Sequence, residues 1–307
     1  MIDPLENPDH RSGFVALLGR PSVGKSSLLN VILRQTVAAV SPRPQTTRRR
    51  QKGILSLPEA QIVFLDTPGI HAPRHRLGEW MMQEVREVID DVDLLMGVFD
   101  ISQPPAEDDA QVGELLASGS RPGRTLGVLN KVDRVDRREI EARAPLFGAL
   151  LPGVEWVPVS AVRGDNVDVL VQALVCMLPP GPRYYPEDLL TDRWERDLAE
   201  DLIRASAMRF LRDEVPYSLA VRLDEYKERD EAGAYVAATL FVERDSQKGI
   251  VIGKGARTLR EIGSFARKEI EALTGRRVFL DLHVKVLPGW RNDLKVLRQL
   301  GMGSSSR

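Results

Sequence analysis

The chain has 307 residues, more than one hydrophobic core usually serves, so we expect two domains. Its 43 basic and 44 acidic side chains nearly balance, so any surface that binds a polyanion has to be a local patch. The single cysteine, Cys176, excludes an intramolecular disulfide and a thiolate metal cluster, and we expect it in the core. Residues 1–11 lack a signal-peptide pattern, and no apolar run reaches the roughly 18 residues that span a bilayer, which predicts a cytoplasmic protein.

Short apolar runs alternate with longer helical patterns through the first half of the chain. This alternation predicts a doubly wound α/β domain with a mostly parallel sheet. Ligands bind such sheets at the carboxyl ends of the strands, so the segments that follow the strands are the candidate site. The predicted strands are Phe14–Leu18, Gln61–Leu65, Leu94–Phe99, Thr125–Leu129 and Trp156–Val159, and the predicted helices are Lys25–Arg34, Gly78–Ile89, Asp108–Ala117, Arg137–Leu150 and Val167–Met177.

A proline-rich stretch, residues 178–182, ends this half and predicts a stiff connection. The pattern beyond it is that of an α+β domain, so we place the domain boundary between residues 182 and 183 and expect residues 303–307 to be a disordered tail. The predicted elements are a helix at Leu189–Leu211, strands at Ser218–Glu225 and Tyr235–Val242, a turn at Gly249–Gly255, a helix at Arg257–Leu273 and a strand at Arg277–Val286.

The segment Gly19–Ser26 fits the phosphate-binding pattern G-x-x-x-x-G-K-[ST], directly after a predicted strand and before a predicted helix. Gly24 lets the backbone N–H groups turn inward, and the helix directs its positive dipole end at the phosphates. We expect Lys25 to reach the β- and γ-phosphates and Ser26 to bind Mg²⁺. The predicted nucleotide contacts are Gly19, Arg20, Pro21, Ser22, Val23, Gly24, Lys25, Ser26 and Ser27.

The segment Asp66–Gly69 follows another predicted strand and fits the pattern D-x-x-G. The Asp66 carboxylate can hold the magnesium shell, and the Gly69 N–H can bond the γ-phosphate and sense its loss. We therefore predict nucleotide contacts from Asp66, Thr67, Pro68 and Gly69.

Between these two motifs lies the polar segment Thr36–Lys52, which is typical of a switch loop. A threonine in such a loop completes magnesium coordination when the γ-phosphate is present and is released when it is gone. We predict Thr47 for this role, with Thr46 as the competing choice.

An N-K-x-D pattern begins at Asn130 and predicts that the base is guanine. Asp133 can accept hydrogen bonds from the ring N–H and the exocyclic amine of guanine, whereas adenine would leave this carboxylate unpaired. Lys131 can lie along the base plane, and Asn130 can tie neighbouring loops together. Ser160 and Ala161, after the last predicted strand of this domain, can direct backbone N–H groups at the guanine oxygen.

Residues 249–256, G-I-V-I-G-K-G-A, are typical of a KH domain, in which a G-x-x-G loop clamps a single-stranded RNA backbone. From Arg244 to Arg277 the chain carries nine basic and four acidic side chains, which supports a local RNA-binding patch. The alternative is that these charges only solvate a helix face. The predicted RNA contacts are Lys248, Ile252, Gly253, Lys254, Gly255, Ala256 and Arg257.

With these motifs the chain resembles the Era GTPase family over nearly its full length. The block Val242–Gly255 is the most specific part, because it separates Era from related ribosome-assembly GTPases. The resemblance implies an α/β P-loop GTPase domain followed by an α+β type II KH domain. The segments that carry it are Gly19–Ser26, Pro44–Arg48, Asp66–Gly69, Asn130–Asp133, Ser160–Gly164, Glu243–Ile250 and Ile252–Gly255.

The resemblance implies an enzyme that hydrolyses GTP to GDP and phosphate with Mg²⁺ as cofactor. It implies a role in small ribosomal subunit maturation, through binding near the 3′ end of the small-subunit ribosomal RNA. Some members of the family associate peripherally with the inner face of the cell membrane. We expect a monomer, because no coiled-coil heptads are present.

Three residues depart from the family or from related GTPases. Ser22 replaces the usual Asn, which in related GTPases helps to hold a catalytic K⁺ ion, and this argues against a potassium requirement. Ala256 replaces the last Gly of the KH loop and adds a methyl group near the RNA backbone. Ile70 stands where Ras-like proteins have the Gln that orients the attacking water, as is usual in this family.

We expect in-line attack of water on the γ-phosphate, with Lys25 and Gly69 as the catalytic groups and a slow intrinsic rate. We further hypothesise that RNA binding and nucleotide state are coupled through the linker Pro179–Pro186. A P-loop kinase or ATPase is one alternative, and the N-K-x-D pattern argues against it. The other is an RNA-binding scaffold with an inactive nucleotide switch, which Ile70 keeps open.

Overall fold

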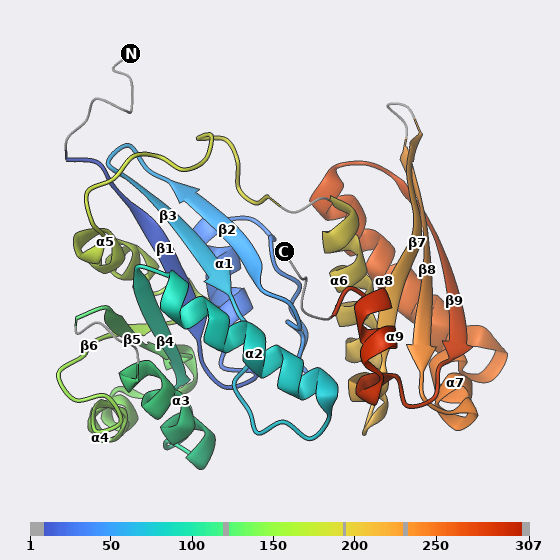
Figure 1. Cartoon of the computed structure of the whole chain (residues 1–307), viewed down its shortest axis with the longest axis horizontal. Coiled ribbons are helices and arrows are strands. Elements are labelled where there is room, and N and C mark those ends of the chain that lie inside the picture. Colours follow the sequence, from blue (N-terminus) through green and yellow to red (C-terminus); the bar gives the residue numbers. More distant parts are fainter. Residues whose placement is uncertain (1–8, 119–122, 193–194, 230–232, 303–307) are drawn as a thin grey trace. The chain divides into compact units, whose positions relative to one another are not determined.

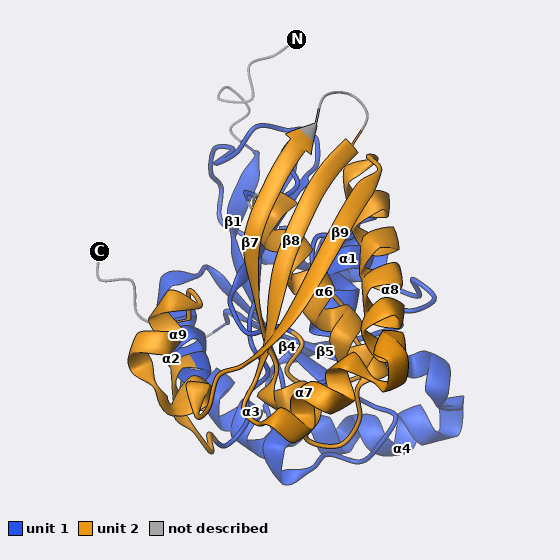
Figure 2. Cartoon of the chain, turned by 90° about the vertical axis from the view of Figure 1, so that its right-hand side faces the viewer, with its two compact units in different colours: residues 1–38, 47–72, 81–192 blue, residues 39–46, 73–80, 193–307 orange. Residues whose placement is uncertain are grey.

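The computed structural model describes residues 9–118, 123–192, 195–229 and 233–302. The chain divides into two compact units, coloured separately in Figure 2. The first comprises residues 1–38, 47–72 and 81–192, and the second comprises residues 39–46, 73–80 and 193–307. The domain boundary expected between residues 182 and 183 stays a prediction.

The first unit is built on a six-stranded sheet with the strand order β2-β3-β1-β4-β5-β6 (Figure 1). Only the pair β2–β3 is antiparallel; the other four neighbouring pairs are parallel, which confirms the mostly parallel α/β sheet. The strands are β1 (Arg11–Leu18), β2 (Gln51–Ser56), β3 (Ala60–Asp66), β4 (Leu94–Asp100), β5 (Thr125–Asn130) and β6 (Glu155–Val159).

Helices cover both faces of this sheet, because successive side chains of a strand point to opposite faces. On β1, Leu17 joins the apolar cluster that contains residues of α1 (Lys25–Leu33) and α5 (Val167–Met177). The next residue, Leu18, joins the cluster on the other face. That cluster contains residues of α2 (Arg76–Asp91), α3 (Glu107–Ala117) and α4 (Arg137–Gly148).

The second unit is an α+β domain, as predicted, with the strand order β7-β8-β9. The β7–β8 pair is antiparallel and the β8–β9 pair is parallel, and helices α6 and α8 cover one face of the sheet (Figure 2). The elements are α6 (Glu195–Phe210), β7 (Ala220–Arg229), β8 (Gly233–Val242), α7 (Asp245–Ile252), α8 (Arg257–Thr274), β9 (Val278–Val286) and α9 (Leu294–Gln299).

Two predictions about the connecting segments are wrong. Strand β2 occupies the end of the predicted switch loop, where Gln51 pairs with Asp66 in the β2–β3 ladder. Helix α6 begins at Glu195 rather than at Leu189. The residues before it run beside β2 instead, where the Leu190 carbonyl accepts a hydrogen bond from the Ile54 N–H at 2.8 Å.

Three further differences concern local environment. Gly249 lies inside helix α7 rather than in a turn. Cys176 is exposed rather than in the core, because α5 buries Leu170 and Leu174 on its opposite side. Helix α9 was not predicted.

Residues 303–307, the predicted tail, lie outside the described residues. None of the described helices is long and apolar enough to cross a bilayer.

Candidate functional site

The phosphate-binding loop joins the carboxyl end of β1 to the first turn of α1, where backbone N–H groups have no helical partner. Gly24 has φ = 100°, in the region that favours glycine, and a Cβ there would lie 2.4 Å from Nδ2 of Asn130. The loop conformation therefore requires glycine at this position, as the motif predicts.

Lys25 lies under this loop and is 6% exposed. Its Nζ donates hydrogen bonds to the carbonyl oxygens of Gly19, at 2.9 Å, and Arg20, at 3.2 Å. Burial lowers the pKa of Lys25 to about 8, against the opposing effect of the Asp66 charge. An anionic phosphate beside this ammonium would raise the pKa of Lys25 again, so nucleotide binding would favour the protonated side chain.

Three oxygens from separate segments meet beside Lys25. Ser26 Oγ lies 2.6 Å from Asp66 Oδ2 and 2.9 Å from Thr47 Oγ1, and Thr47 Oγ1 lies 3.1 Å from the same carboxylate oxygen. Mg²⁺ takes octahedral oxygen ligands at about 2.0–2.1 Å, which puts neighbouring ligand oxygens about 2.9 Å apart. The residues present therefore fit a magnesium ion.

The hydroxyl of Thr46, the competing choice, is engaged within its own segment. It donates to the Arg43 carbonyl at 2.9 Å and contacts Ser41 Oγ at 2.7 Å. Thr47 is therefore the threonine whose side chain lies with Ser26 and Asp66, and its role as a metal ligand stays a prediction.

The segment Asp66–Gly69 approaches the phosphate loop closely. A Cβ at Gly69 would lie 2.7 Å from the Pro21 backbone, so only glycine fits this contact. The Ile70 N–H donates to the Gly19 carbonyl at 3.0 Å, and the Thr67 hydroxyl donates to the Leu17 carbonyl at 2.6 Å. The structure thus brings this segment to the phosphate loop, as the γ-phosphate role of Gly69 requires.

Asn130 ties three loops together, as the sequence predicts. Its Nδ2 donates to the Val23 carbonyl at 2.8 Å, and its Oδ1 accepts from the backbone N–H groups of Lys131, at 2.8 Å, and Ala161, at 3.0 Å. One oxygen of Asp133 accepts a hydrogen bond from Ser160 Oγ at 2.7 Å. Asn130 and the other predicted base-recognition residues therefore lie together at the carboxyl ends of β5 and β6. These others are Lys131, Asp133, Ser160 and Ala161.

Two carboxylates that motif reasoning missed, Asp100 and Asp109, pair with predicted nucleotide-site residues in these loops. Lys131 Nζ donates to Asp100 Oδ2 at 2.6 Å and to the Ser22 carbonyl at 2.7 Å. Arg20 Nε donates to the buried Asp109 at 2.9 Å. Asp100 is the last residue of strand β4. Because ligands bind such sheets at the carboxyl ends of the strands, this position could have marked Asp100 as a candidate site residue in the sequence.

Asp100 is 6% exposed. Burial alone would raise the pKa of its carboxyl, but hydrogen bonds from Lys131 and Ser102 outweigh this and lower the pKa below its ordinary value. Asp100 is therefore an anion held in place by a cation of the predicted base-recognition motif.

In the second unit, the G-x-x-G loop links α7 to α8. Gly253 has φ = 72°, and a Cβ there would lie 2.3 Å from Thr258 Oγ1, so no side chain fits. Gly255 and Ala256 are also left-handed, with φ of 59° and 60°. Lys254 and Arg257 are exposed beside the loop, whereas Lys248 and Ile252 are half-buried on α7.

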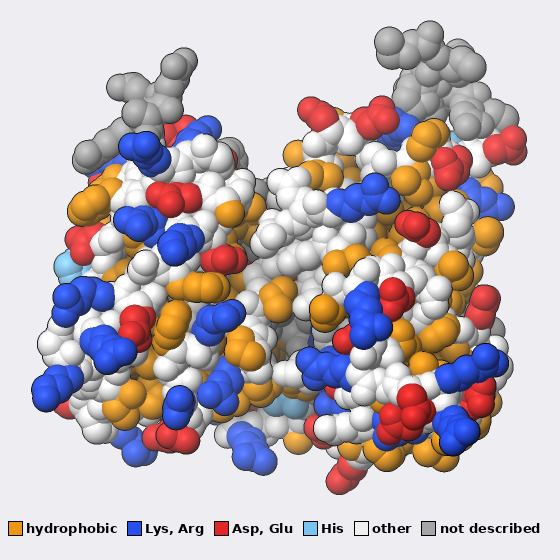
Figure 3. Space-filling model, turned by 180° about the vertical axis from the view of Figure 1, so that it is seen from behind, with side chains coloured by type: hydrophobic (Ala, Val, Ile, Leu, Met, Phe, Trp, Pro, Cys, Tyr) orange, Lys and Arg blue, Asp and Glu red, His pale blue; other side chains and the backbone are white. Residues whose placement is uncertain are grey.

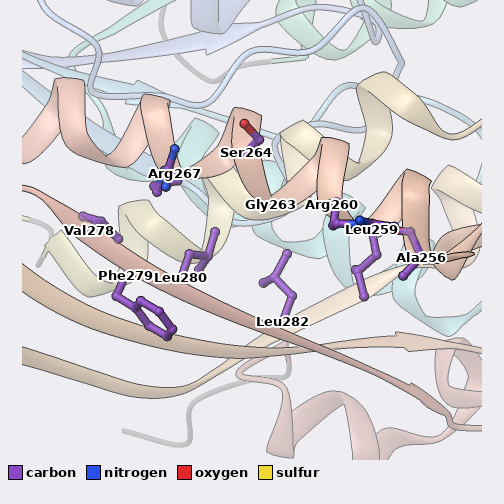
Figure 4. Close-up of a pocket in the computed structure, with 10 residues that line it drawn as sticks. All are labelled: Ala256, Leu259, Arg260, Gly263, Ser264, Arg267, Val278, Phe279, Leu280 and Leu282. Carbon is purple, nitrogen blue, oxygen red and sulfur yellow. The ribbon is translucent and has the colours of Figure 1, made fainter.

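A groove of about 410 Å³ continues from this loop between α8 and β9 (Figure 4). Of the residues that line it, the sequence analysis predicted only Ala256. Those on α8 recur every three or four positions, which places them on one side of the helix. Viewed from the side on which α8 lies, the second unit carries many Lys and Arg side chains with fewer Asp and Glu among them (Figure 3). The groove is lined by Ala256, Leu259, Arg260, Gly263, Ser264, Arg267, Val278, Phe279, Leu280 and Leu282.

Two family models match the chain, one in each half. Residues 14–131 match a family described as "50S ribosome-binding GTPase", and residues 214–291 match the KH domain family. The GTPase Era of Geobacter metallireducens is 46% identical over 96% of this chain and 99% of its own length. The GTPase Era of Heliobacterium modesticaldum is 43% identical, over 95% and 97%.

The chain belongs to the Era GTPase family. The family, the GTPase domain and the KH domain predicted from the sequence are therefore confirmed, and GTP hydrolysis is the activity of its first domain.

Two solved Era structures cover 96% of this chain and 100% of their own length at 35% identity. One, with a TM-score of 0.91, is Era in complex with MgGDPNP and nucleotides 1506–1542 of 16S ribosomal RNA. The other, with a TM-score of 0.89, is an Aquifex aeolicus Era variant bound to GDP and AlF4⁻.

Proposed function

We propose that this Era family member binds GTP with Mg²⁺ through the predicted nucleotide residues and hydrolyses it by in-line attack of water on the γ-phosphate. The convergence of Ser26, Thr47 and Asp66 carries the proposal, because three oxygens at octahedral spacing end beside a phosphate loop. A bound Mg²⁺ ion would neutralise charge on the β- and γ-phosphate oxygens.

The residues of the chain contribute binding, orientation and charge. The Lys25 ammonium neutralises developing charge on the phosphate oxygens, and the Gly69 N–H donates to the γ-phosphate. Ile70 is 5% exposed and packs in the apolar cluster on one face of the sheet, so it offers no hydrogen bond to the attacking water. We therefore expect slow intrinsic hydrolysis that a partner accelerates.

We propose that the KH domain binds the 3′ region of small-subunit ribosomal RNA and that the protein acts in assembly of that subunit. The matched family description names the large ribosomal subunit. We choose the small-subunit RNA instead because a similar Era structure is a complex with nucleotides 1506–1542 of 16S ribosomal RNA. Peripheral membrane association, a cytoplasmic location and a monomeric state stay predictions.

We also propose that the linker couples nucleotide state to RNA binding. Gln61 of β3 accepts hydrogen bonds from the backbone N–H groups of Tyr184 and Tyr185, at 2.7 and 3.0 Å. Strand β3 ends at Asp66, so the linker is attached to a strand that ends in a predicted magnesium ligand. Equal RNA affinity with GDPNP and GDP would contradict this coupling.

The test of the nucleotide proposal is Asp133→Asn. An amide at this position offers a donor where guanine N1–H needs an acceptor, so the preference should shift from GTP to xanthosine triphosphate by about tenfold or more. Turnover of both nucleotides is measured with and without a 3′ small-subunit RNA fragment. Unchanged guanine preference would overturn the base-pocket assignment, and unchanged turnover with RNA would argue against an RNA-coupled switch.

A further inference from the structure

The groove beside α8 is long enough for a short stretch of single-stranded RNA and no more. Its lining on this side runs from Ala256, the residue before α8, to Arg267, which is eleven steps of 1.5 Å or roughly 16 Å. KH domains clamp four nucleotides. A fifth nucleotide of the same strand therefore has to lie beyond one end of the groove.

Phe279 lies at the end of the groove away from the G-x-x-G loop. Figure 4 shows Arg267 and Phe279 near this end and Ala256 near the other, with the Phe279 ring projecting away from α8. Strand β9 is the edge of its sheet, so a strand of RNA that leaves the groove here can pass over it. Arg267 is exposed and, within the described part of the chain, makes no ion pair with a carboxylate.

Phe279 keeps 68% of its surface exposed. It packs against Tyr235 of the neighbouring strand β8, with ring centroids 5.8 Å apart and planes 15° from parallel. Tyr235 thus orients the phenyl ring without burying it. A rigid, exposed aromatic ring is what single-strand-binding proteins use to stack a base, whatever the base sequence.

A purely structural role is the competing explanation, because aromatic pairs across strands stabilise sheets. A β-branched aliphatic residue at position 279 would also stabilise the sheet. Sheet stabilisation alone therefore does not explain why an aromatic ring is exposed here. Phe279 borders the groove, and its ring turns across the edge strand β9 to the face of the sheet opposite α8, so a nucleotide that leaves the groove over β9 can reach it.

We propose that Phe279 forms a stacking subsite for one nucleobase of single-stranded RNA, directly beyond the nucleotides held in the groove. This subsite rests on the proposed RNA-binding function. Stacking on an aromatic ring contributes about 5-fold or more to affinity per base.

The experiment measures binding of labelled RNA to the full-length chain by fluorescence anisotropy. Tetramers tiled across the 3′ region of small-subunit RNA identify one that binds, and this tetramer is then extended by one nucleotide at either end. A matched pentamer carries an abasic residue at the added position. The proteins are the wild type, Phe279→Leu, Phe279→Trp and, as a control, Leu294→Ala, which changes an exposed apolar residue outside the groove.

With the wild type, Phe279→Trp and Leu294→Ala, one of the two pentamers should bind about 5-fold or more tighter than the tetramer, and the abasic pentamer should not. Phe279→Leu should lose this gain and still bind the tetramer as the wild type does. An equal gain in Phe279→Leu would overturn the subsite while leaving RNA binding intact. Absence of RNA binding by the wild type would instead overturn the proposed function and the subsite with it.

Discussion

The ammonium of Lys131 lies 2.6 Å from a carboxylate oxygen of Asp100, and the same nitrogen donates to the Ser22 carbonyl at 2.7 Å. One side chain of the predicted base-recognition motif is thereby fixed to the phosphate loop and to the end of strand β4. Asp100 touches no reacting atom, so we regard it as a positioning residue.

Asp100→Asn should therefore weaken binding of GTP and GDP equally, by about tenfold, because the hydrogen bond from Lys131 loses its anionic acceptor. The value of kcat at saturating GTP should change little, since the phosphate contacts remain. Binding is measured with a fluorescent GDP analogue and turnover by phosphate release. Asp90→Asn, which removes the same charge from an exposed position on α2, is the control. A fall in kcat without a change in affinity would contradict the positioning role.

Nucleotide affinity should fall as the pH rises through about 8. Burial lowers the pKa of Lys25 to about 8, and phosphates bound beside it would stabilise the protonated form and raise that pKa. Binding is thus strongest below this pKa and weakens above it, by about tenfold between pH 7 and pH 9. Calorimetric titration with GDP across this range tests the expectation. The Lys25→Arg variant, whose guanidinium does not titrate there, should show a flat profile, and an equal slope in both proteins would contradict the role of Lys25.

Potassium should not stimulate GTP hydrolysis by this chain. Ser22 has φ = 65°, in the left-handed region where Asn is common, but its side chain lacks the carbonyl oxygen that an Asn would offer to an ion. Rates in KCl and NaCl should be equal for the wild type and for Ser22→Ala. Ser22→Asn should gain severalfold stimulation by KCl. Potassium stimulation of the wild type would show that another group holds the ion.

Ala256→Gly should stabilise the KH loop. A non-glycine residue at φ = 60° costs about 1–2 kcal/mol, part of which glycine recovers. We expect the free energy of unfolding in urea to rise by about 0.5–1 kcal/mol and RNA to bind more tightly, because a methyl group leaves the start of the groove. Ala272→Gly, at an exposed helical position on α8, should change stability in the opposite direction. Lower stability for Ala256→Gly would contradict the strain.

The sequence predicted those parts of the site in which local chemistry dictates the residue. Gly24 and Gly253 are required by their own backbone angles and by near neighbours, so a short motif contains enough information to place them. Strands β1, β3, β4, β5 and β6 were predicted because parallel, buried strands are nearly continuous apolar runs.

What the sequence did not predict depends on contacts between distant segments. Asp100 is one acidic residue among many until strand order puts it beside Lys131. Strand β2 begins with Gln51 and Lys52 and ends with Ser56, so it is not a continuous apolar run, and its pairing with β3 decides its conformation. The groove residues of β9 become candidates only when α8 packs alongside them.

The hydrogen bond from Ile54 to Leu190 has a consequence for the chain during synthesis. Strand β2 is the outer strand of its sheet, and an outer strand with free N–H and C=O groups can pair with another molecule. Residues 183–192 run along it and occupy part of that hydrogen-bonding edge. Until the ribosome has made them, the first unit exposes a strand able to self-associate. A chain ending at residue 182 should therefore aggregate more readily than one ending at residue 192.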